Sequence, residues 1–294
     1  MRYLFFVLFG LLPLAASAAI SVHDDAGNTV VLQRPAQRIV TLAPHATELV
    51  FAAGGGERIV GAVDYSDYPP AARSIPRIGD SRQLDIERLI ALKPDLLVLW
   101  LYDNSTHQLE QLRALGIPIF YSEPRKLAEI PDSVLRLGQL LGSEKIARKT
   151  AAELNQKLSN LANQYRARSP VRVFYQVWDR PLYTLNGQHI VSDAIRLCGG
   201  ENIFAKLPAM APSVSVESVL LENPEAVITG ATHQQASSGL EIWKQYPALL
   251  AVRRGNLFVL DADLLSRAGP RMIDGAAALC QSLEQARSRR VGQR

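Results

Sequence analysis

The chain has 294 residues, of which 48% are apolar, and a formal net charge of +4 at pH 7. This length suits two domains of ordinary size, and the apolar content is sufficient for two hydrophobic cores. Nucleic acid is excluded as an expected partner, because the chain has no stripe of basic residues with interleaved aromatic residues.

The N-terminus has the pattern of a cleavable export signal. Arg2 supplies a positive charge, Leu4 to Leu14 is apolar, and Ala16-Ser17-Ala18 is a small-x-small cleavage pattern. We therefore predict a signal peptide over residues 1–18. The apolar run is shorter than the roughly 20 residues of a membrane span, and no cysteine follows it for lipid attachment. These features predict a non-lipidated protein that is exported to the periplasm.

Strand and helix patterns alternate in the first half of the chain. Pro44 suits the first turn of a helix, so it supports a helix directly after the first strand. The glycines at 54–56 follow this helix, and we interpret them as a helix C-cap and turn, because a phosphate-binding loop would precede a helix. The predicted strands are 38–42, 58–62 and 117–121, the predicted helices are 43–51 and 109–115, and a helix and strand share 85–100.

Two segments of the chain match each other in pattern. Residues 85–99 and residues 215–229 each contain an apolar-faced helix, a proline and a short aliphatic strand. Glu87 and Glu217 lie 130 positions apart (217 minus 87), and the prolines share this offset. This offset is longer than the period of a solenoid repeat, which is roughly 20–50 residues. The match predicts two lobes of similar build, each with an exposed glutamate early in an equivalent helix; a chance match of a common pattern is the alternative.

Residues 127–168 show leucines at helical spacing and no strand pattern. A break at Gly142-Ser143 separates two helices, and the second continues towards Tyr165 without glycine or proline. A single long helix between two lobes would act as a stiff connection. The predicted division is a signal peptide (1–18), a first α/β lobe (19–142), a connecting helix (143–168), a second α/β lobe (169–286) and a solvated basic tail (287–294).

The second lobe repeats the alternation of strands and helices. Its predicted strands are 171–177, 226–229 and 257–260, and its predicted helices are 190–197, 216–221, 240–246 and 271–286. Alternating elements with short connections form parallel sheets. The predicted fold class is therefore α/β, with two Rossmann-like lobes, parallel sheets and a ligand cleft between the lobes.

The loops after the strands carry the candidate ligand-binding residues, because ligands of parallel α/β sheets bind beyond the C-terminal ends of the strands. These residues are Tyr65, Trp100, Trp178, Tyr183, Asp263 and Arg267. A groove with aromatic walls and a few polar groups is typical of a small-molecule site. The alternatives are aromatic packing inside the lobes, exposure of Leu182 instead of Tyr183, and a local i,i+4 ion pair between Asp263 and Arg267.

Cys198 and Cys280 are the two cysteines of the chain. In an oxidising compartment such a pair usually forms one disulfide. Closing a loop of roughly 80 residues would stabilise the second lobe by up to about 4 kcal/mol. Two buried free thiols are the alternative, and metal binding is disfavoured because no His or Cys lies nearby at ligand spacing.

Four segments of the chain resemble the periplasmic cobalamin-binding proteins, which are the substrate-binding subunits of cobalamin ABC importers. The segments are Tyr65–Pro70, Ile86–Asp95, Leu197–Phe204 and Arg267–Arg271, and they span almost the whole mature chain. The second and third also occur in the wider group of helical-backbone binding proteins for cobalamin, haem and ferric siderophores. The first points more narrowly to cobalamin.

The resemblance implies a periplasmic protein that captures cobalamin, or a related cobamide, and delivers it to an ABC transporter permease dimer in the inner membrane. It implies that Tyr65, Trp100 and Tyr183 pack on the corrin ring and that Asp263 and Arg267 reach polar groups of the ligand. Glu87 and Glu217 would pair with arginines of the permease, and Cys198 and Cys280 would form the disulfide of the family. We expect a monomer.

Two departures from the family pattern leave a second ligand open. Where cobalamin binders carry further tryptophans in the cleft, this chain has Ser81 and Ala211, and Trp178 would have to compensate. The loss of aromatic area matters because each buried aromatic side chain contributes about 1.5–3 kcal/mol. Haem or a ferric siderophore is therefore the alternative ligand, with His45 as the candidate axial ligand of haem iron.

The sequence gives little support for metal binding or catalysis. No two of the five histidines have the helix-face spacing of a zinc site. The chain also lacks a Gly-x-Ser-x-Gly nucleophile motif and an obvious pair of catalytic carboxylates. We therefore expect a binding protein without a metal, a cofactor or an enzymatic activity.

Overall fold

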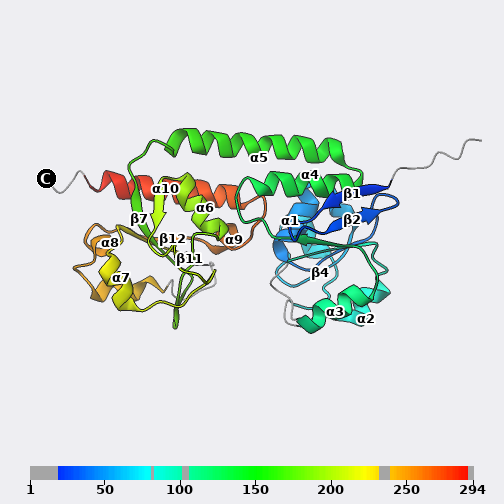
Figure 1. The fold of residues 1–294 in the computed structure, drawn as a ribbon, viewed down its shortest axis with the longest axis horizontal. Helices are drawn as coiled ribbons and strands as arrows, with labels where there is room; N and C mark the ends of the chain where they lie inside the picture. The colour runs from blue at the N-terminus through cyan, green and yellow to red at the C-terminus, as the bar shows by residue number, and fades with distance from the viewer. Residues whose placement is uncertain (1–18, 81–82, 101–105, 232–238, 291–294) are drawn as a thin grey trace, which may run out of the picture.

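The computed structural model describes residues 19–80, 83–100, 106–231 and 239–290, so the predicted signal peptide and Ser81 lie outside the described residues. The chain forms two α/β lobes that lie side by side, and one long helix, α5 (Glu144–Tyr165), runs along the same edge of both (Figure 1). The predicted fold class, two parallel-sheet lobes joined by a single long helix, is confirmed.

The first lobe is built on a four-stranded parallel sheet. In spatial order its strands are β4 (Ile59–Ala62), β3 (Ile39–Thr41), β5 (Leu96–Trp100) and β6 (Ile119–Ser122). The strands are short, mainly aliphatic and largely buried, as expected where helices cover both faces of a parallel sheet. The helices of this lobe are α1 (Pro44–Ala52), α2 (Ile86–Ala91), α3 (Thr106–Ala114) and α4 (Glu129–Leu141), with the 3-10 helices η1 (Gly56–Arg58) and η2 (Pro70–Ser74).

The second lobe has a parallel sheet of the same size. In spatial order its strands are β10 (Gly200–Asn202), β7 (Val171–Gln176), β11 (Ala226–Ala231) and β12 (Leu257–Asp261). Its helices are α6 (Ile190–Leu197), α7 (Val216–Glu222), α8 (Leu250–Arg253), α9 (Ala262–Leu265) and α10 (Met272–Ser288), with the 3-10 helix η3 (Leu240–Gln245). The sequence pattern did not predict β10, and the helix predicted over 240–246 is the 3-10 helix η3.

Two antiparallel hairpins also lie outside the predicted elements. β1 (Ile20–His23) pairs with β2 (Thr29–Leu32), and β8 (Trp178–Asp179) pairs with β9 (Leu182–Tyr183). Strands of two to four residues are too short to give a clear alternation of apolar and polar residues in the sequence. The first hairpin buries its apolar face on the core of the first lobe, beside α4.

The internal repeat predicted from the sequence is present in three dimensions. Asp85 and Ser215 are the N-caps of α2 and α7, and each side chain accepts a hydrogen bond from the backbone N–H three residues later. After these helices, Lys93 and Asn223 both adopt the left-handed conformation, with φ of 47° and 44°. Because non-glycine residues rarely adopt this conformation, its recurrence at equivalent positions argues against a chance match.

The two cysteines form a disulfide. Cys198 directly follows α6 and Cys280 lies in α10, and the bond joins residues that are 82 positions apart. The prediction of one bond within the second lobe is therefore confirmed, and neither cysteine is free.

The structure describes the basic C-terminal end as far as Arg290, and the prediction of a solvated tail over 287–294 is wrong for Arg287 and Arg290. Arg287 is only 7% exposed, and its Nη2 donates a hydrogen bond to the carbonyl oxygen of Cys198 at 2.7 Å. Arg290 forms an ion pair with the buried carboxylate of Glu225. The composition of the tail could not predict these contacts, because the oxygen atoms that accept from the arginines lie far away in the sequence. A guanidinium group can be buried where several such oxygens surround it.

α4 and α5 pack closely because one side chain is missing between them. A Cβ atom added to Gly138 would lie 2.2 Å from the Cβ of Ala147, which is far inside van der Waals contact. Gly142 ends α4 in the left-handed conformation, with φ of 62°, and allows the chain to turn into α5. The position of the connecting helix over the first lobe therefore depends on two glycines.

We predict that Gly138→Ala destabilises the folded protein by about 1–3 kcal/mol through overpacking. This loss should occur although alanine favours a helix by about 1 kcal/mol over glycine. In an Ala147→Gly background the added methyl group has space, so the same substitution should be neutral or stabilising. Urea unfolding of the four variants measures both effects, and an equal loss of stability in both backgrounds would contradict the packing argument.

Candidate functional site

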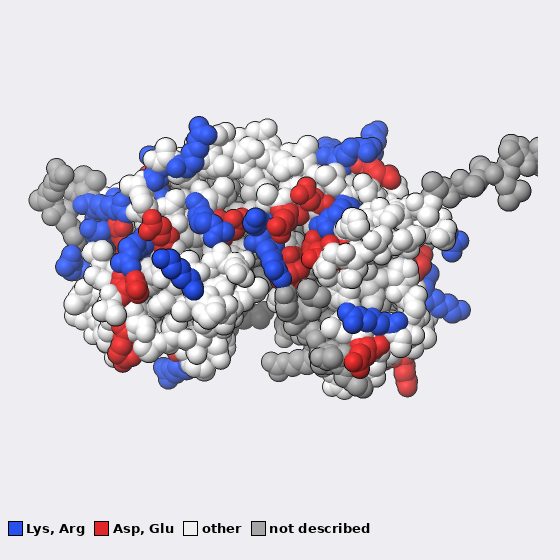
Figure 2. Space-filling view, in the orientation of Figure 1, with Lys and Arg blue, Asp and Glu red and all other residues white. Residues whose placement is uncertain are grey.

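A recess of about 60 Å³ lies between the two lobes. Its lining residues are His45, Trp100, Glu123, Pro124 and Arg125 of the first lobe and Gln188, His189, Ile190, Met210, Ser266 and Ala268 of the second. Figure 2 shows that the surface is hollowed between the lobes at the edge opposite α5, and that acidic and basic side chains are mixed on this face. The recess is therefore a site to which both lobes contribute.

Two side chains of the first lobe meet where neighbouring strands end. Trp100 is the last residue of β5, and its side chain donates a hydrogen bond to the carboxyl group of Glu123, which directly follows β6. Burial raises the pKa of Glu123 to about 7, against the lowering effects of the Trp100 hydrogen bond and the charge of Arg125. The Oε2 atom of Glu123 is buried and has no hydrogen-bond partner among the described residues.

Two histidines, one from each lobe, line the same recess. His45 of α1 lies edge-on to Trp100, with ring centroids 6.0 Å apart, and its Nε2 is 3.3 Å from the carbonyl oxygen of Ser122. His189 caps α6, and its Nδ1 accepts a hydrogen bond from the backbone N–H of Val191 at 3.2 Å. Burial lowers the pKa of each imidazole to about 4, so both rings are neutral near pH 7.

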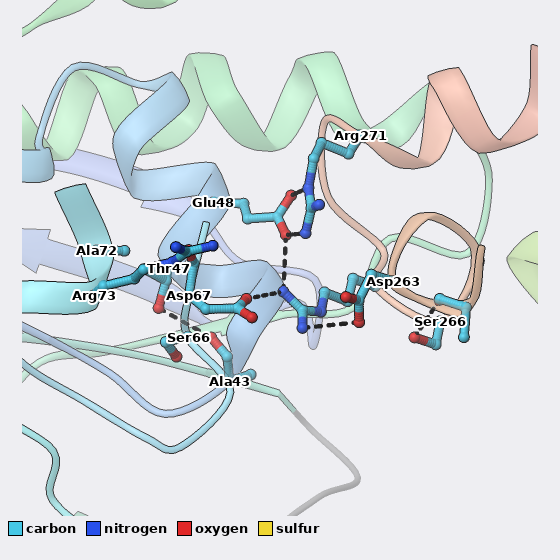
Figure 3. Close-up of polar contacts among 12 residues, drawn as sticks. Ala43, Thr47, Glu48, Ser66, Asp67, Ala72, Arg73, Asp263, Ser266 and Arg271 are labelled. Atoms are coloured by element: carbon cyan, nitrogen blue, oxygen red, sulfur yellow. Dashed lines mark hydrogen bonds and ion pairs between the residues drawn. The ribbon is translucent and has the colours of Figure 1, made fainter. Parts of the chain in front are cut away.

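Beside the recess, an ion-pair network crosses from one lobe to the other (Figure 3). Arg271 donates two hydrogen bonds to Glu48 of α1, at 2.6 and 3.1 Å. Arg267 forms ion pairs with Asp67 at 2.7 Å, with Asp263 at 3.0 Å and with Glu48 at 3.6 Å. Glu48 and Asp67 belong to the first lobe, whereas both arginines belong to the second, so the network joins the lobes directly.

The carboxylate of Glu48 is the buried centre of this network, at 3% exposure. Burial raises the pKa of Glu48, and the adjacent guanidinium groups of Arg271 and Arg267 oppose this effect. At the edge of the network, burial acts to raise the pKa of Asp67, but its hydrogen bond and charge interaction with Arg267 outweigh burial and lower it. Two guanidinium groups thus compensate two carboxylates across the junction between the lobes.

Three of the predicted ligand-binding residues are aromatic side chains exposed to solvent. Tyr65 is 77% exposed and has a left-handed backbone, with φ of 63°. Trp178 and Tyr183 are 54% and 37% exposed and face each other across the β8–β9 hairpin, whereas Leu182 is buried. None of the three lines the recess, and the alternative that they pack inside the lobes is wrong.

The structure brings Trp100 to the recess and places Asp263 and Arg267 in the network beside it. The local i,i+4 ion pair considered for these two residues is present, but Arg267 also reaches Asp67 and Glu48 in the other lobe. Their contact with a ligand stays a prediction.

Sequence reasoning did not identify Glu123, His189 or Glu48 as site residues. Glu123 lies two residues beyond the predicted strand 117–121, so the rule that placed Trp100 at the cleft also applied to it. His189 lies directly before a predicted helix, where it caps the first turn. For Glu48 no local signal exists, because its partner Arg271 is 223 positions away in the sequence.

The two glutamates of the internal repeat are exposed. Glu87 lies in the first turn of α2 and Glu217 in the first turn of α7. Both helices lie on the edge of the molecule opposite α5, one in each lobe (Figure 1). The arrangement thus presents one acidic group from each lobe on the same edge.

Within the described ranges, no group of three or more His, Cys, Asp or Glu side chains is placed to bind a metal ion. Among the same residues, no helix is long and apolar enough to cross a membrane.

A protein with two α/β lobes, a stiff connecting helix and a recess between the lobes has the architecture of a solute-binding protein. The chain belongs to the periplasmic binding protein family, whose model matches residues 39–264. It is 38% identical over 251 residues to the vitamin B12-binding protein of Vibrio cholerae serotype O1, a match that covers 85% of this chain and 90% of that protein.

Two solved structures show the same fold. The crystal structure of the periplasmic vitamin B12 binding protein BtuF of Vibrio cholerae matches with a TM-score of 0.80 and 37% identity, over 86% of this chain and 98% of that chain. The periplasmic heme-binding protein RhuT from Roseiflexus sp. RS-1, in apo form, matches with a TM-score of 0.71 and 25% identity, over 85% and 98% of the two chains.

We predict that acid destabilises the protein partly through His45. Its pKa is 6.5 in the unfolded chain and about 4 in the folded one, so between these pH values the unfolded chain binds more protons. The stability contributed by the neutral ring is complete above pH 6.5 and decreases towards pH 4, with a slope of up to about 1.4 kcal/mol per pH unit.

The slope is measured by urea unfolding of the wild type and of His45→Gln. The variant should show the shallower slope, whereas His23→Gln, at an exposed position, should match the wild type. Comparing variant with wild type is necessary because the raised pKa of Glu123 gives a slope of opposite sign. Equal slopes for the wild type and His45→Gln would contradict the prediction.

Proposed function

We propose that this protein captures cobalamin, or a related cobamide, in the periplasm and delivers it to an ABC importer of the inner membrane. The observation that carries the proposal is the recess between the lobes, with Trp100 on its wall, in a chain that resembles proteins named for vitamin B12 binding over most of its length.

The exposed aromatic side chains support a large, flat ligand. Tyr65, Trp178 and Tyr183 expose apolar rings that contribute little to the cores of the lobes. Aromatic rings offer wide contact areas with few rotatable bonds, so they bind a macrocycle at a low cost in conformational entropy. We propose that these rings form the rim of the site and that Trp100 lies deeper, with Asp263 and Arg267 beside it.

Haem is the second candidate ligand, because a haem-binding protein shares the fold and His45 lines the recess. The hydrogen bond of His45 to Ser122 disfavours iron ligation through Nε2. A carbonyl oxygen only accepts hydrogen bonds, so Nε2 carries the proton that it donates to Ser122 and has no free lone pair for iron. Ligation through Nε2 would require this bond to break, whereas Nδ1 keeps its lone pair.

The ligand is identified by incubating the purified protein with cobalamin or with haem and recording the visible spectrum after gel filtration. We expect a retained corrinoid spectrum, and stoichiometric binding in calorimetry with cobalamin. A retained Soret band without corrinoid binding would establish the haem alternative, and a colourless protein in both cases would overturn the proposal.

We further propose that Glu87 and Glu217 dock on the transporter. Two equivalent carboxylates on one edge match the two equivalent subunits of a permease dimer, and charge pairs at the rim of an interface set orientation and association rate more than affinity.

The double variant Glu87→Arg/Glu217→Arg should therefore retain the cobalamin affinity of the wild type and lose most of its cobalamin uptake in cells. Glu153→Arg is the matched control, because Glu153 is an exposed helical glutamate on α5, at the opposite edge. Uptake by the double variant at the level of the control would discard the docking role.

A further inference from the structure

The carboxyl group of Glu123 accepts a hydrogen bond from Trp100, but one of its two oxygens has no partner among the described residues. Its backbone N–H donates to Asp25 at 2.6 Å, and its side chain accepts the hydrogen bond of Trp100. The Oε2 atom is buried without a partner among the described residues. A buried acceptor without a donor costs about 1–3 kcal/mol, more when it is charged. On a residue that lines a recess, such an atom points to a donor supplied by a ligand.

The size of the recess limits which part of a ligand can reach this atom. A volume of about 60 Å³ accommodates a few waters or one small polar group, and it is far too small for a macrocycle. Glu123 therefore faces a substituent at the ligand's edge. His189, on the second lobe, adds a donor, because its Nδ1 accepts from Val191 and its Nε2 then carries the proton.

We propose that Glu123 is a specificity-determining residue that selects a macrocycle with amide side chains over one with carboxylate side chains. The inference rests on the proposed function and extends it. A primary amide offers an N–H to the unpaired oxygen of Glu123 and a carbonyl oxygen to a donor such as His189. The corrin edge carries such amides, whereas haem carries two propionates, whose negative charge would face the carboxylate.

The selection depends on pH because the charge of Glu123 does. Burial raises its pKa to about 7, the hydrogen bond of Trp100 and the charge of Arg125 lower it, and the charge of Asp25 adds to the rise. The two histidines of the recess, His45 and His189, stay neutral above pH 6, and the guanidinium group of Arg125 is the remaining charged group of the lining. An amide fits both forms of Glu123, whereas a carboxylate fits only the protonated form, which is lost as the pH rises.

The test uses cobalamin and the cobalamin monocarboxylic acids, in which one side-chain amide is hydrolysed. Calorimetry from about pH 6 to about pH 8.5 should give a nearly constant affinity for cobalamin. For at least one monocarboxylic acid, the affinity should decrease by up to roughly tenfold per pH unit above 7. This comparison needs only the wild-type protein.

Glu123→Gln then isolates the residue, because its amide keeps the shape of the side chain and can donate to a carboxylate. The variant should bind cobalamin within about threefold of the wild type. Discrimination is the ratio of the affinity for cobalamin to the affinity for that acid. In the variant this ratio should decrease at least tenfold and should lose its pH dependence. Glu110→Gln, at an exposed position on α3, is the matched control and should behave as the wild type.

The outcomes separate this inference from the proposed function. If the wild type binds cobalamin but binds every monocarboxylic acid equally well at all pH values, Glu123 does not select amides and only this inference is overturned. The inference is likewise overturned if Glu123→Gln folds, as judged by its thermal unfolding, and keeps the discrimination of the wild type. If the wild type binds no corrinoid at all, the proposed function itself is overturned.

Discussion

The arrangement of the two lobes depends on a buried carboxylate that one lobe contributes and the other compensates. Glu48 lies on α1 at 3% exposure, and the guanidinium groups that pair with it, those of Arg271 and Arg267, come from the second lobe. Leaving a buried charge without its partner costs about 3–5 kcal/mol, so separating the lobes at this point would be expensive. Together with α5, which spans both lobes, the network holds their relative position.

A fixed junction determines how the site can work. Ion pairs within the protein join the two walls of the recess, so we expect the recess to be formed before a ligand arrives. A preformed site loses little conformational entropy on binding, which favours affinity without a large closure of the lobes. The exposed rings of Tyr65, Trp178 and Tyr183 fit this picture, since they stand ready at the surface.

Local patterns in the sequence predicted the lobes, the connecting helix and the end of β5 at Trp100, because the alternation of strands and helices and the break at Gly142 are properties of neighbouring residues. The same reasoning missed the short hairpins, whose strands are too brief to show a period, and the 3-10 form of η3. It could not find the pairing of Glu48 with Arg271, which are 223 positions apart. Arg287 was misjudged for the same reason, since its acceptors lie in distant parts of the chain.

Two carboxyl groups lie near the junction between the lobes, those of Glu48 and Glu123. Their hydrogen-bond partners show how a structural residue differs from a ligand-binding residue. Glu48 has guanidinium donors for both of its oxygens, so its charge is compensated within the protein and needs nothing from outside. Glu123 has a donor for one oxygen and none among the described residues for the other, and burial keeps its pKa near 7. A buried polar atom that folding leaves unpaired is destabilising, and a bound molecule that pairs with this atom removes the cost. The difference between the two glutamates therefore assigns the first to the junction and the second to the ligand.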